Sequence, residues 1–365
     1  MENFRRRSFL KLMGQFTAVL CMGLSHKKAL ALGGNTANRK RTKRIAVEEH
    51  VRYDEFSNYI FSLSDSPPES PPAPGMPGGG GQMMKTLSDG TQVPLEVIGN
   101  IDQVDMRLKE MDAVGIDMHV LSISNPGVTE LDASEAIKWS KKINDKLAEV
   151  VNKYPTRFAA FSTIPWQDPT AAVAELERAV KELGLKGIKL DGTVNGEYLD
   201  SKRFWPIHKK AEELGTPIFI HVENARPSFI EFYSEFSQSR ATSGAGRDLD
   251  VCMHAFRLIA SGLFEECPDL KFILGHMGAG VPFWTKRFGG EKYIKNNIFV
   301  ATSGNFYQPA LMCCYQAAGV DQILFAVDFP SDSNKQAIQL IESAPISNND
   351  KEKIYHLNAE RIFSL

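Results

Sequence analysis

Residues 45–50 read Ile-Ala-Val-Glu-Glu-His, a short apolar run followed by three polar side chains. In a β-strand, successive side chains point to opposite faces. Glu48 and His50 therefore share one face, while Glu49 points the other way. An apolar run of this length is typical of a strand that is buried on both faces of a parallel sheet. The polar residues at its carboxyl end indicate a functional site just beyond the strand.

Similar short apolar runs recur along the chain, and segments with helical spacing of apolar residues separate most of them. The predicted strands are residues 45–47, 118–123, 158–161, 187–190, 217–221, 271–274, 298–301 and 323–327. The predicted helices include residues 102–113, 133–153, 170–183, 204–214, 248–260, 309–318 and 335–343. Eight alternating units predict an α/β fold of the closed (β/α)8 barrel type, with an open doubly wound sheet as the competitor. No GxGxxG motif follows the first strand, which disfavours dinucleotide binding.

Several predicted strands end in a carboxylate or an imidazole, and the carboxyl ends of barrel strands meet at one mouth. The first strand carries Glu48 and His50, and three later strands end in His221, His276 and Asp328. Each residue alone fits a structural role, and Asp328 fits a helix cap. Their joint placement predicts a single metal site made of Glu48, His50, His221 and Asp328. This donor set suits Zn²⁺ or Mn²⁺, with Mg²⁺ or Fe²⁺ as alternatives.

Four further histidines fit structural roles. We expect His119 to pack within a strand and His208 to lie on an exposed helix face. His254 and His356 fit structural positions on helices.

The first 31 residues predict an export signal. Residues 5–11 read Arg-Arg-Arg-Ser-Phe-Leu-Lys, an apolar stretch covers residues 12–24, and Ala-Leu-Ala stands at residues 29–31. This pattern resembles a twin-arginine signal and predicts a periplasmic protein; a cytosolic N-terminal extension is the alternative. The apolar stretch is too short for a stable membrane anchor.

The rest of the chain, residues 32–365, is expected to form one domain with a Pro/Gly-rich loop at residues 66–81. With 43% hydrophobic and 24% charged residues, the composition is that of an ordinary globular protein. The formal net charge of −2 and the lack of a basic stripe argue against a nucleic-acid partner. No CxxC spacing indicates zinc or redox chemistry.

Several motifs together resemble the amidohydrolase-related carboxy-lyases, over about residues 44–363. This family includes γ-resorcylate, 2,3-dihydroxybenzoate and aminocarboxymuconate semialdehyde decarboxylases. The motifs that carry the resemblance are Val-Glu-Glu-His at 47–50, residues 187–196, Ile-His at 220–221, Gly-His-Met-Gly at 275–278, residues 325–330, and Asn-Ala-Glu-Arg at 358–361. The Glu-x-His pair at residues 48–50 looks most like the dihydroxybenzoate decarboxylase branch.

The resemblance implies a metal-dependent, non-oxidative decarboxylase of a hydroxylated aromatic or related unsaturated carboxylate. It implies that His276 assists proton transfer, with Asp328 as the other candidate donor. It also implies that Arg287 reaches a substrate site across a subunit interface, and that Asn195 and Phe329 contact the substrate. The family implies a homodimer or homotetramer.

One departure from the family pattern keeps other functions open. The decarboxylases usually carry glutamate where this chain has Ala279, which puts the proton relay in doubt. A metal-dependent hydrolase of a lactone, ester or cyclic amide is the alternative, with a metal-bound hydroxide as its nucleophile. Lys189 ends the fourth predicted strand, where binuclear amidohydrolases place a carboxylated lysine; pairing with Asp191 is its other interpretation. A non-catalytic periplasmic binding protein is the third class.

Overall fold

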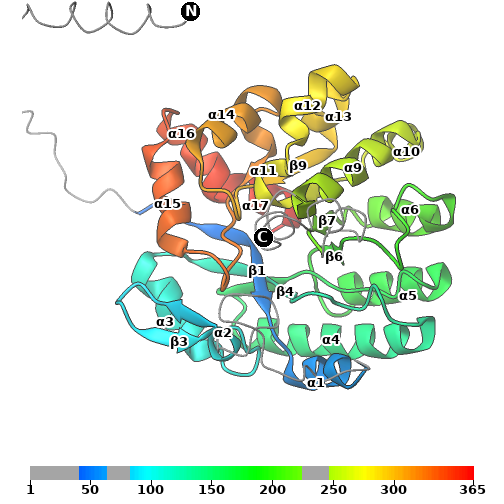
Figure 1. Cartoon of the computed structure of the whole chain (residues 1–365), viewed down its shortest axis with the longest axis horizontal. Helices are drawn as coiled ribbons and strands as arrows, with labels where there is room; N and C mark the ends of the chain where they lie inside the picture. Colours follow the sequence, from blue (N-terminus) through cyan, green and yellow to red (C-terminus); the bar gives the residue numbers. More distant parts are fainter. Residues whose placement is uncertain (1–40, 64–82, 224–245) are drawn as a thin grey trace, which may run out of the picture. The chain divides into compact units, whose positions relative to one another are not determined.

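The computed structural model of the chain describes residues 41–63, 83–223 and 246–365 (Figure 1). Residues Thr42–Leu365 form one compact unit. The predicted export signal at residues 1–31 and the Pro/Gly-rich segment at residues 66–81 lie outside the described residues. None of the helices within the described ranges is long and apolar enough to cross a membrane.

Eight parallel strands form the centre of the described unit. They are β1 (Ile45–Val51), β4 (Met118–Ile123), β5 (Phe158–Ala160), β6 (Ile188–Asp191), β7 (Ile218–His221), β8 (Phe272–Leu274), β9 (Ile298–Ala301) and β10 (Ile323–Leu324). Strand pairing follows the orders β1-β4-β5 and β10-β9-β8-β7-β6. Two seams join these sheets. At one, the Ser162 amide donates to the Gly187 carbonyl at 2.8 Å. At the other, the Val47 amide donates to the Phe325 carbonyl at 3.0 Å. The strands therefore close into the predicted barrel.

Helices surround the strands, as Figure 1 shows from one end of the barrel. The main helices are α3 (Val104–Val114), α4 (Ala133–Lys153), α5 (Pro169–Lys181), α6 (Trp205–Glu213), α9 (Gly246–Ala260), α12 (Val281–Phe288), α14 (Gln308–Ala317) and α15 (Asn334–Ser343). Shorter helices are α10 (Leu263–Glu266), α11 (Gly275–Gly278), α13 (Glu291–Asn296), α16 (Asn348–Glu352) and α17 (Asn358–Phe363). Local chemistry sets several boundaries: Asp168 caps α5 by accepting from Thr170 and Ala171 amides, and Gly115 ends α3 in the left-handed conformation.

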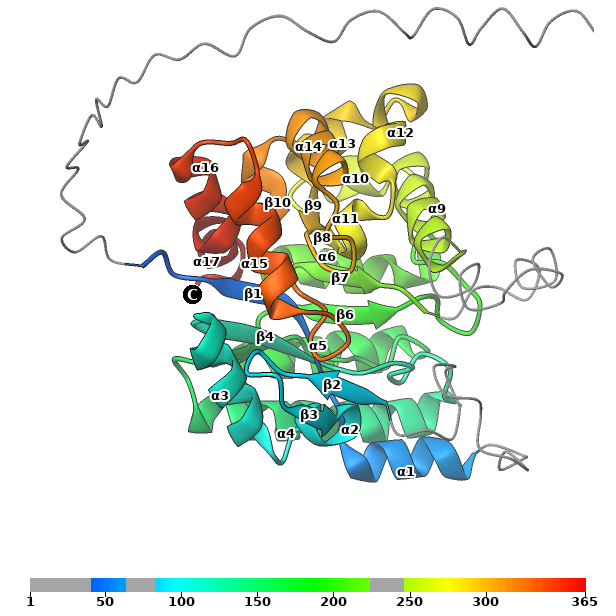
Figure 2. The ribbon, with the colours of Figure 1, turned by 60° about the vertical axis from the view of Figure 1, so that its left-hand side comes forward.

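The segment between residues 52 and 100, in which the sequence shows little periodicity, contains regular structure. It forms α1 (Asp54–Ser62), the hairpin β2 (Met84–Thr86) with β3 (Gln92–Pro94), and α2 (Leu95–Ile98). Figure 2 shows the hairpin and α2 beside α3. Each element is too short to produce a clear period in the sequence.

His208 is fully buried, so the expectation that it lies on an exposed helix face is wrong. Its ring lies 5.9 Å from that of Phe272, and its Nε2 donates to the Leu199 carbonyl at 2.9 Å. Burial lowers the pKa of His208 to about 4, so the ring is neutral near pH 7. Helix α6 carries this polar group inward because a backbone carbonyl satisfies it.

A β-bulge interrupts β1 beside the carboxylate of the predicted site. Ala46 pairs with His119 and Glu49 pairs with Leu121, so one more residue lies on β1 than on β4 between these pairs. Val47 packs with the residues that fill the barrel, whereas Ala46 packs toward the helices. Strict alternation from Val47 would turn Glu48 outward. The extra residue of the bulge lets both Val47 and Glu48 face the interior.

Glu49 faces away from the interior and holds the segment after β10 against β1. Its carboxylate is fully buried and accepts hydrogen bonds from the backbone amides of Val327 (3.1 Å) and Phe329 (3.2 Å). Arg107, also fully buried, donates to the His50 carbonyl and lies 4.8 Å from the Phe329 ring. Side-chain hydrogen bonds thus reinforce this barrel seam.

Replacing Glu49 with alanine should destabilise the protein strongly. The substitution leaves two buried amide donors unpaired and removes the carboxylate beside Arg107. We expect the free energy of unfolding to fall by about 3 kcal/mol or more, measured by urea denaturation. Glu177→Ala, which removes an exposed ion pair with Lys181, should leave the denaturation midpoint unchanged. Equal stability of Glu49→Ala and wild type would show that the seam does not depend on this carboxylate.

Candidate metal centre

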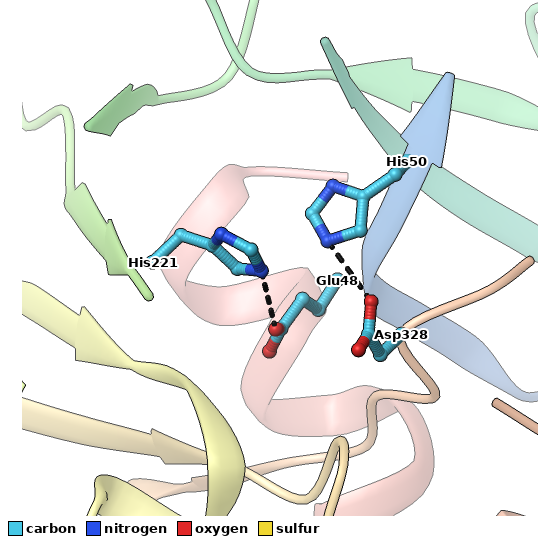
Figure 3. A group of neighbouring side chains, drawn as sticks. All are labelled: Glu48, His50, His221 and Asp328. Atoms are coloured by element: carbon cyan, nitrogen blue, oxygen red, sulfur yellow. Dashed lines mark ion pairs between the residues drawn. The ribbon is translucent and has the colours of Figure 1, made fainter. Parts of the chain in front are cut away.

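The structure brings the predicted ligands Glu48, His50, His221 and Asp328 together at the carboxyl ends of the strands. One donor atom from each lies within 4.8 Å of the others. His50 Nε2 is 3.1 Å from Asp328 Oδ1, and His221 Nε2 is 3.4 Å from Glu48 Oε1 (Figure 3). Glu48 and His50 come from β1, His221 from the end of β7, and Asp328 from the segment after β10.

Each of these two imidazoles is oriented by a partner at Nδ1. His50 Nδ1 lies 3.1 Å from Ser122 Oγ on the neighbouring strand β4. His221 Nδ1 lies 3.1 Å from Asp191 Oδ1 on the neighbouring strand β6. With Nδ1 carrying the proton, each ring presents Nε2 as the ligand atom. Partners of this kind fix the tautomer and the ring orientation of metal-binding histidines.

Buried polar atoms without hydrogen bonds surround the centre of the cluster. They are Glu48 Oε1, His50 Nε2, His221 Nε2 and the Nε2 of the nearby His276. Native structures leave few buried polar groups unsatisfied because each one costs free energy. A cation bound in the cluster would satisfy the lone pairs of the Glu48, His50 and His221 atoms at once. The donor set therefore fits a single divalent metal ion, as the sequence predicts.

The charges of the site also suit a cation. Burial would raise the pKa of Asp328, but the facing imidazoles of His276 and His50 outweigh it and hold that pKa below its usual range. For Glu48, burial is likewise outweighed by His221 and His276, so its pKa is lowered. Burial, with the nearby Lys189 charge, lowers the pKa of His50 to about 4. Glu48, His50 and Asp328 are therefore deprotonated near pH 7, the form that binds metals.

Backbone conformation helps to aim the side chains. Asp328 has a φ of 73° and His276 a φ of 50°, both in the left-handed region that non-glycine residues rarely adopt. Such strain concentrates at functional sites. At Gly275, an added Cβ would lie 2.8 Å from Glu48 Oε2. Glycine at this position makes room for the Glu48 carboxylate, to which Ser303 also donates a hydrogen bond.

A cavity of about 770 Å³ opens above the cluster. Its lining residues include His50, His221, His276 and Asp328, and also Arg52, Ser57, Met83, Leu95, Arg247 and Asp332. The described residues 52–63 and 83–100 therefore help to line the cavity, although the sequence there shows no clear period. The volume suits a small organic ligand.

Three predicted substrate contacts lie away from this cavity. Phe329 is fully buried in the core, 5.7 Å from the His119 ring, so its side chain does not reach the cavity. Asn195 is exposed in the segment after β6, and Arg287 is exposed on α12. The resemblance implied a substrate contact for Phe329, but its ring packs in the hydrophobic core. A role for Arg287 across a subunit interface remains a prediction.

Lys189 is held by several acceptors rather than presented to the metal site. Its Nζ lies 2.5 Å from Asp191 Oδ1, 2.9 Å from the Ile123 carbonyl and 3.2 Å from Asn125 Oδ1. The expected pairing with Asp191 is confirmed. Burial would raise the pKa of Asp191, but Lys189 and His221 lower it to about 2. The lysine thus supports the ligand His221 through Asp191.

Sequence reasoning missed Ser122, Ser303 and Asp248 as supporting residues. Ser122 was detectable in principle, because its position in β4 puts it on the same face as the interior Val120. The sequence gives no indication of the roles of Asp248 and Ser303. Each role depends on how a segment distant in the sequence packs at the barrel mouth.

A closed (β/α)8 barrel whose mouth carries a group of four side chains able to hold one metal ion is typical of metal-dependent amidohydrolase-type enzymes. Comparison with known proteins agrees: residues 91–365 match the family model described as Amidohydrolase. γ-Resorcylate decarboxylase of Polaromonas sp. (strain JS666) is 35% identical, covering 73% of this chain and 88% of that protein. γ-Resorcylate decarboxylase of Rhodococcus jostii (strain RHA1) is 33% identical, covering 88% and 98% respectively.

A solved structure of a dihydroxybenzoic acid decarboxylase from Polaromonas sp. JS666, with bound manganese and the inhibitor 2-nitroresorcinol, is also similar. It aligns with a TM-score of 0.75 at 31% identity, covering 89% of this chain and 98% of that one. The chain therefore belongs to the amidohydrolase family, and within it to the group of non-oxidative decarboxylases that contains the γ-resorcylate decarboxylases.

Substituting Gly275 with alanine should weaken metal binding. The new Cβ would push the Glu48 carboxylate out of place, and we expect the affinity for Mn²⁺ to fall on the order of ten- to a hundred-fold. Calorimetric titration of the metal-free protein measures this. Gly290→Ala is the control, since its Cβ would lie 3.3 Å from the flexible Ile259 side chain and far from the ligands. Unchanged Mn²⁺ affinity in Gly275→Ala would contradict the assignment of Glu48 as a ligand.

Proposed function

We propose that the protein is a metal-dependent, non-oxidative decarboxylase of hydroxylated aromatic carboxylates. The observation that carries the proposal is the cluster of Glu48, His50, His221 and Asp328, whose unsatisfied donor atoms face a cavity that His276 also lines. The decarboxylase relatives support it, because they match most of this chain. Manganese in the Polaromonas structure favours Mn²⁺, and the mixed nitrogen and oxygen donors are compatible with it.

Loss of CO₂ from an aromatic ring needs a proton at the carbon that bears the carboxylate, because direct cleavage would leave an aryl carbanion. A divalent ion held by Glu48, His50, His221 and Asp328 would supply positive charge toward the carboxylate of the substrate. His276 is placed to deliver the proton, since its Nε2 lies 3.5 Å from Glu48 Oε1 and 3.7 Å from Asp328 Oδ2 at the cavity wall. After protonation, the electron pair of the breaking C–C bond returns to the ring and CO₂ leaves.

Asp328 is the weaker candidate for proton delivery because its neighbours keep it ionised. The contacts of Lys189 count against the hydrolase alternative. Carboxylation of Lys189 would place a negative charge beside Asp191. It would also remove the positive charge that now donates to Asp191, the Ile123 carbonyl and Asn125.

The decisive experiment combines metal analysis with a substrate screen. We expect one divalent ion per chain and CO₂ release from at least one dihydroxybenzoate in the Mn²⁺-loaded protein, with none from benzoate. His276→Gln should lower kcat by about 10²- to 10⁴-fold while retaining the metal. Hydrolysis of lactones with two ions per chain, and no CO₂ from any hydroxybenzoate, would contradict the proposal.

We also propose that residues 1–31 direct the protein to the periplasm, on the basis of the Arg6-Arg7 pair and the apolar stretch that follows it. Replacing both arginines with lysine should leave the uncleaved chain in the cytoplasm, as judged by fractionation and immunoblotting. Equal export of the variant and wild type would contradict the twin-arginine assignment.

A further inference from the structure

A carboxylate from α9 holds the imidazole of His276. Asp248 lies in the first turn of α9, and its Oδ1 is 2.8 Å from His276 Nδ1. The His276 side chain is 15% exposed and that of Asp248 is 34% exposed, so water only partly screens the contact. With the Nδ1 proton donated to Asp248, Nε2 is the atom that faces Glu48 and Asp328.

Other neighbours restrict the position of His276 but do not select the protonation of its nitrogens. Its backbone amide donates to Ser303 Oγ at 3.2 Å. Gly304 lies against the ring, where an added Cβ would come within 2.6 Å of His276 Cδ2. These contacts fix the backbone and one face of the ring, and neither determines which nitrogen carries a proton. The hydrogen bond to Asp248 does, because a carboxylate can only accept from Nδ1–H.

Helix α9 is itself anchored, so Asp248 has a defined position. The Tyr198 hydroxyl donates to Asp250 at 2.5 Å, and Arg257 pairs with Asp200 at 2.8 Å. His254 Nε2 accepts from the Leu199 amide at 3.0 Å. These contacts tie α9 to the segment after β6, on the rim of the same barrel mouth.

The same arrangement recurs at all three histidines of the site. His50 and His221 are oriented through Nδ1 by Ser122 and Asp191, which lie on adjacent strands. The partner of His276 comes instead from a separate helix. The side chain at position 279, close to His276 in the sequence, is a methyl group that offers no acceptor.

We propose that Asp248 is the positioning residue for His276: it accepts a hydrogen bond from Nδ1–H, so the ring keeps its Nδ1 proton and Nε2 is the nitrogen that carries and delivers the proton to the reacting centre. The expected effect on kcat rests on the proposed decarboxylase function. The hydrogen bond that keeps a proton on His276 Nδ1 does not. Asp248 acts through His276 and needs no contact with the substrate.

The test compares Asp248→Ala, Asp248→Asn and the control Glu197→Ala in the Mn²⁺-loaded protein. Glu197→Ala removes an exposed carboxylate that pairs with Arg203 on the segment after β6, without touching His276 or α9. For Asp248→Ala we expect kcat to fall on the order of ten- to a hundred-fold, with KM and metal content unchanged. Asp248→Asn, whose carbonyl still accepts from Nδ1, should recover part of the loss. The solvent deuterium isotope effect on kcat should rise in Asp248→Ala, because proton transfer becomes slower.

A second readout does not depend on turnover. In protein labelled with ¹⁵N-histidine, the His276 ring signals are identified by their loss in His276→Gln. We expect a protonated Nδ1 in the wild type and a mixture of tautomers in Asp248→Ala. An unchanged Nδ1 signal in Asp248→Ala would overturn the inference even if no substrate were found. An equal loss of kcat in Glu197→Ala, or an unchanged isotope effect in Asp248→Ala, would also overturn it. Absence of CO₂ release by the wild type would refute the proposed function separately.

Discussion

Between Ala46 and Glu49, β1 carries one residue more than its partner strand, and this bulge sets the direction of every polar side chain that follows on β1. Val47 already faces the barrel interior. Without the extra residue, the pleat would turn Glu48 toward the helices, into an apolar layer where an isolated carboxylate is costly. With it, Glu48 and His50 both face the mouth. Bulges commonly re-aim side chains next to active sites in this way.

The same bulge turns Glu49 outward, where its carboxylate accepts hydrogen bonds from the backbone amides of Val327 and Phe329. These amides flank Asp328, so the residue after the first ligand fixes the position of the last one. Strand β1 thus supplies two ligands directly and holds a third through the backbone. The closure of the barrel and the assembly of the metal centre are consequently one structural event.

Much of this arrangement could be predicted from the sequence. Strands buried on both faces leave short apolar runs, and polar residues at their ends stand out against them, which is why Glu48, His50, His221 and Asp328 could be identified. The bulge could not be predicted, because it depends on pairing between β1 and β4. The local alternation argument still gave the correct faces for Glu48, Glu49 and His50. Asp248 could not be predicted either, since its role depends on where α9 begins relative to the mouth.

The surroundings of the cluster also determine how many cations it can hold. Glu48 and Asp328 contribute two negative charges, and His50 is held neutral. One divalent ion balances the two carboxylates. A second ion would need a further anionic bridging ligand. Lys189, the candidate for such a carboxylated bridge, already donates to three acceptors. Breaking these contacts would also release Asp191 from its role in orienting His221. The network that aligns the first ion therefore opposes the binding of a second.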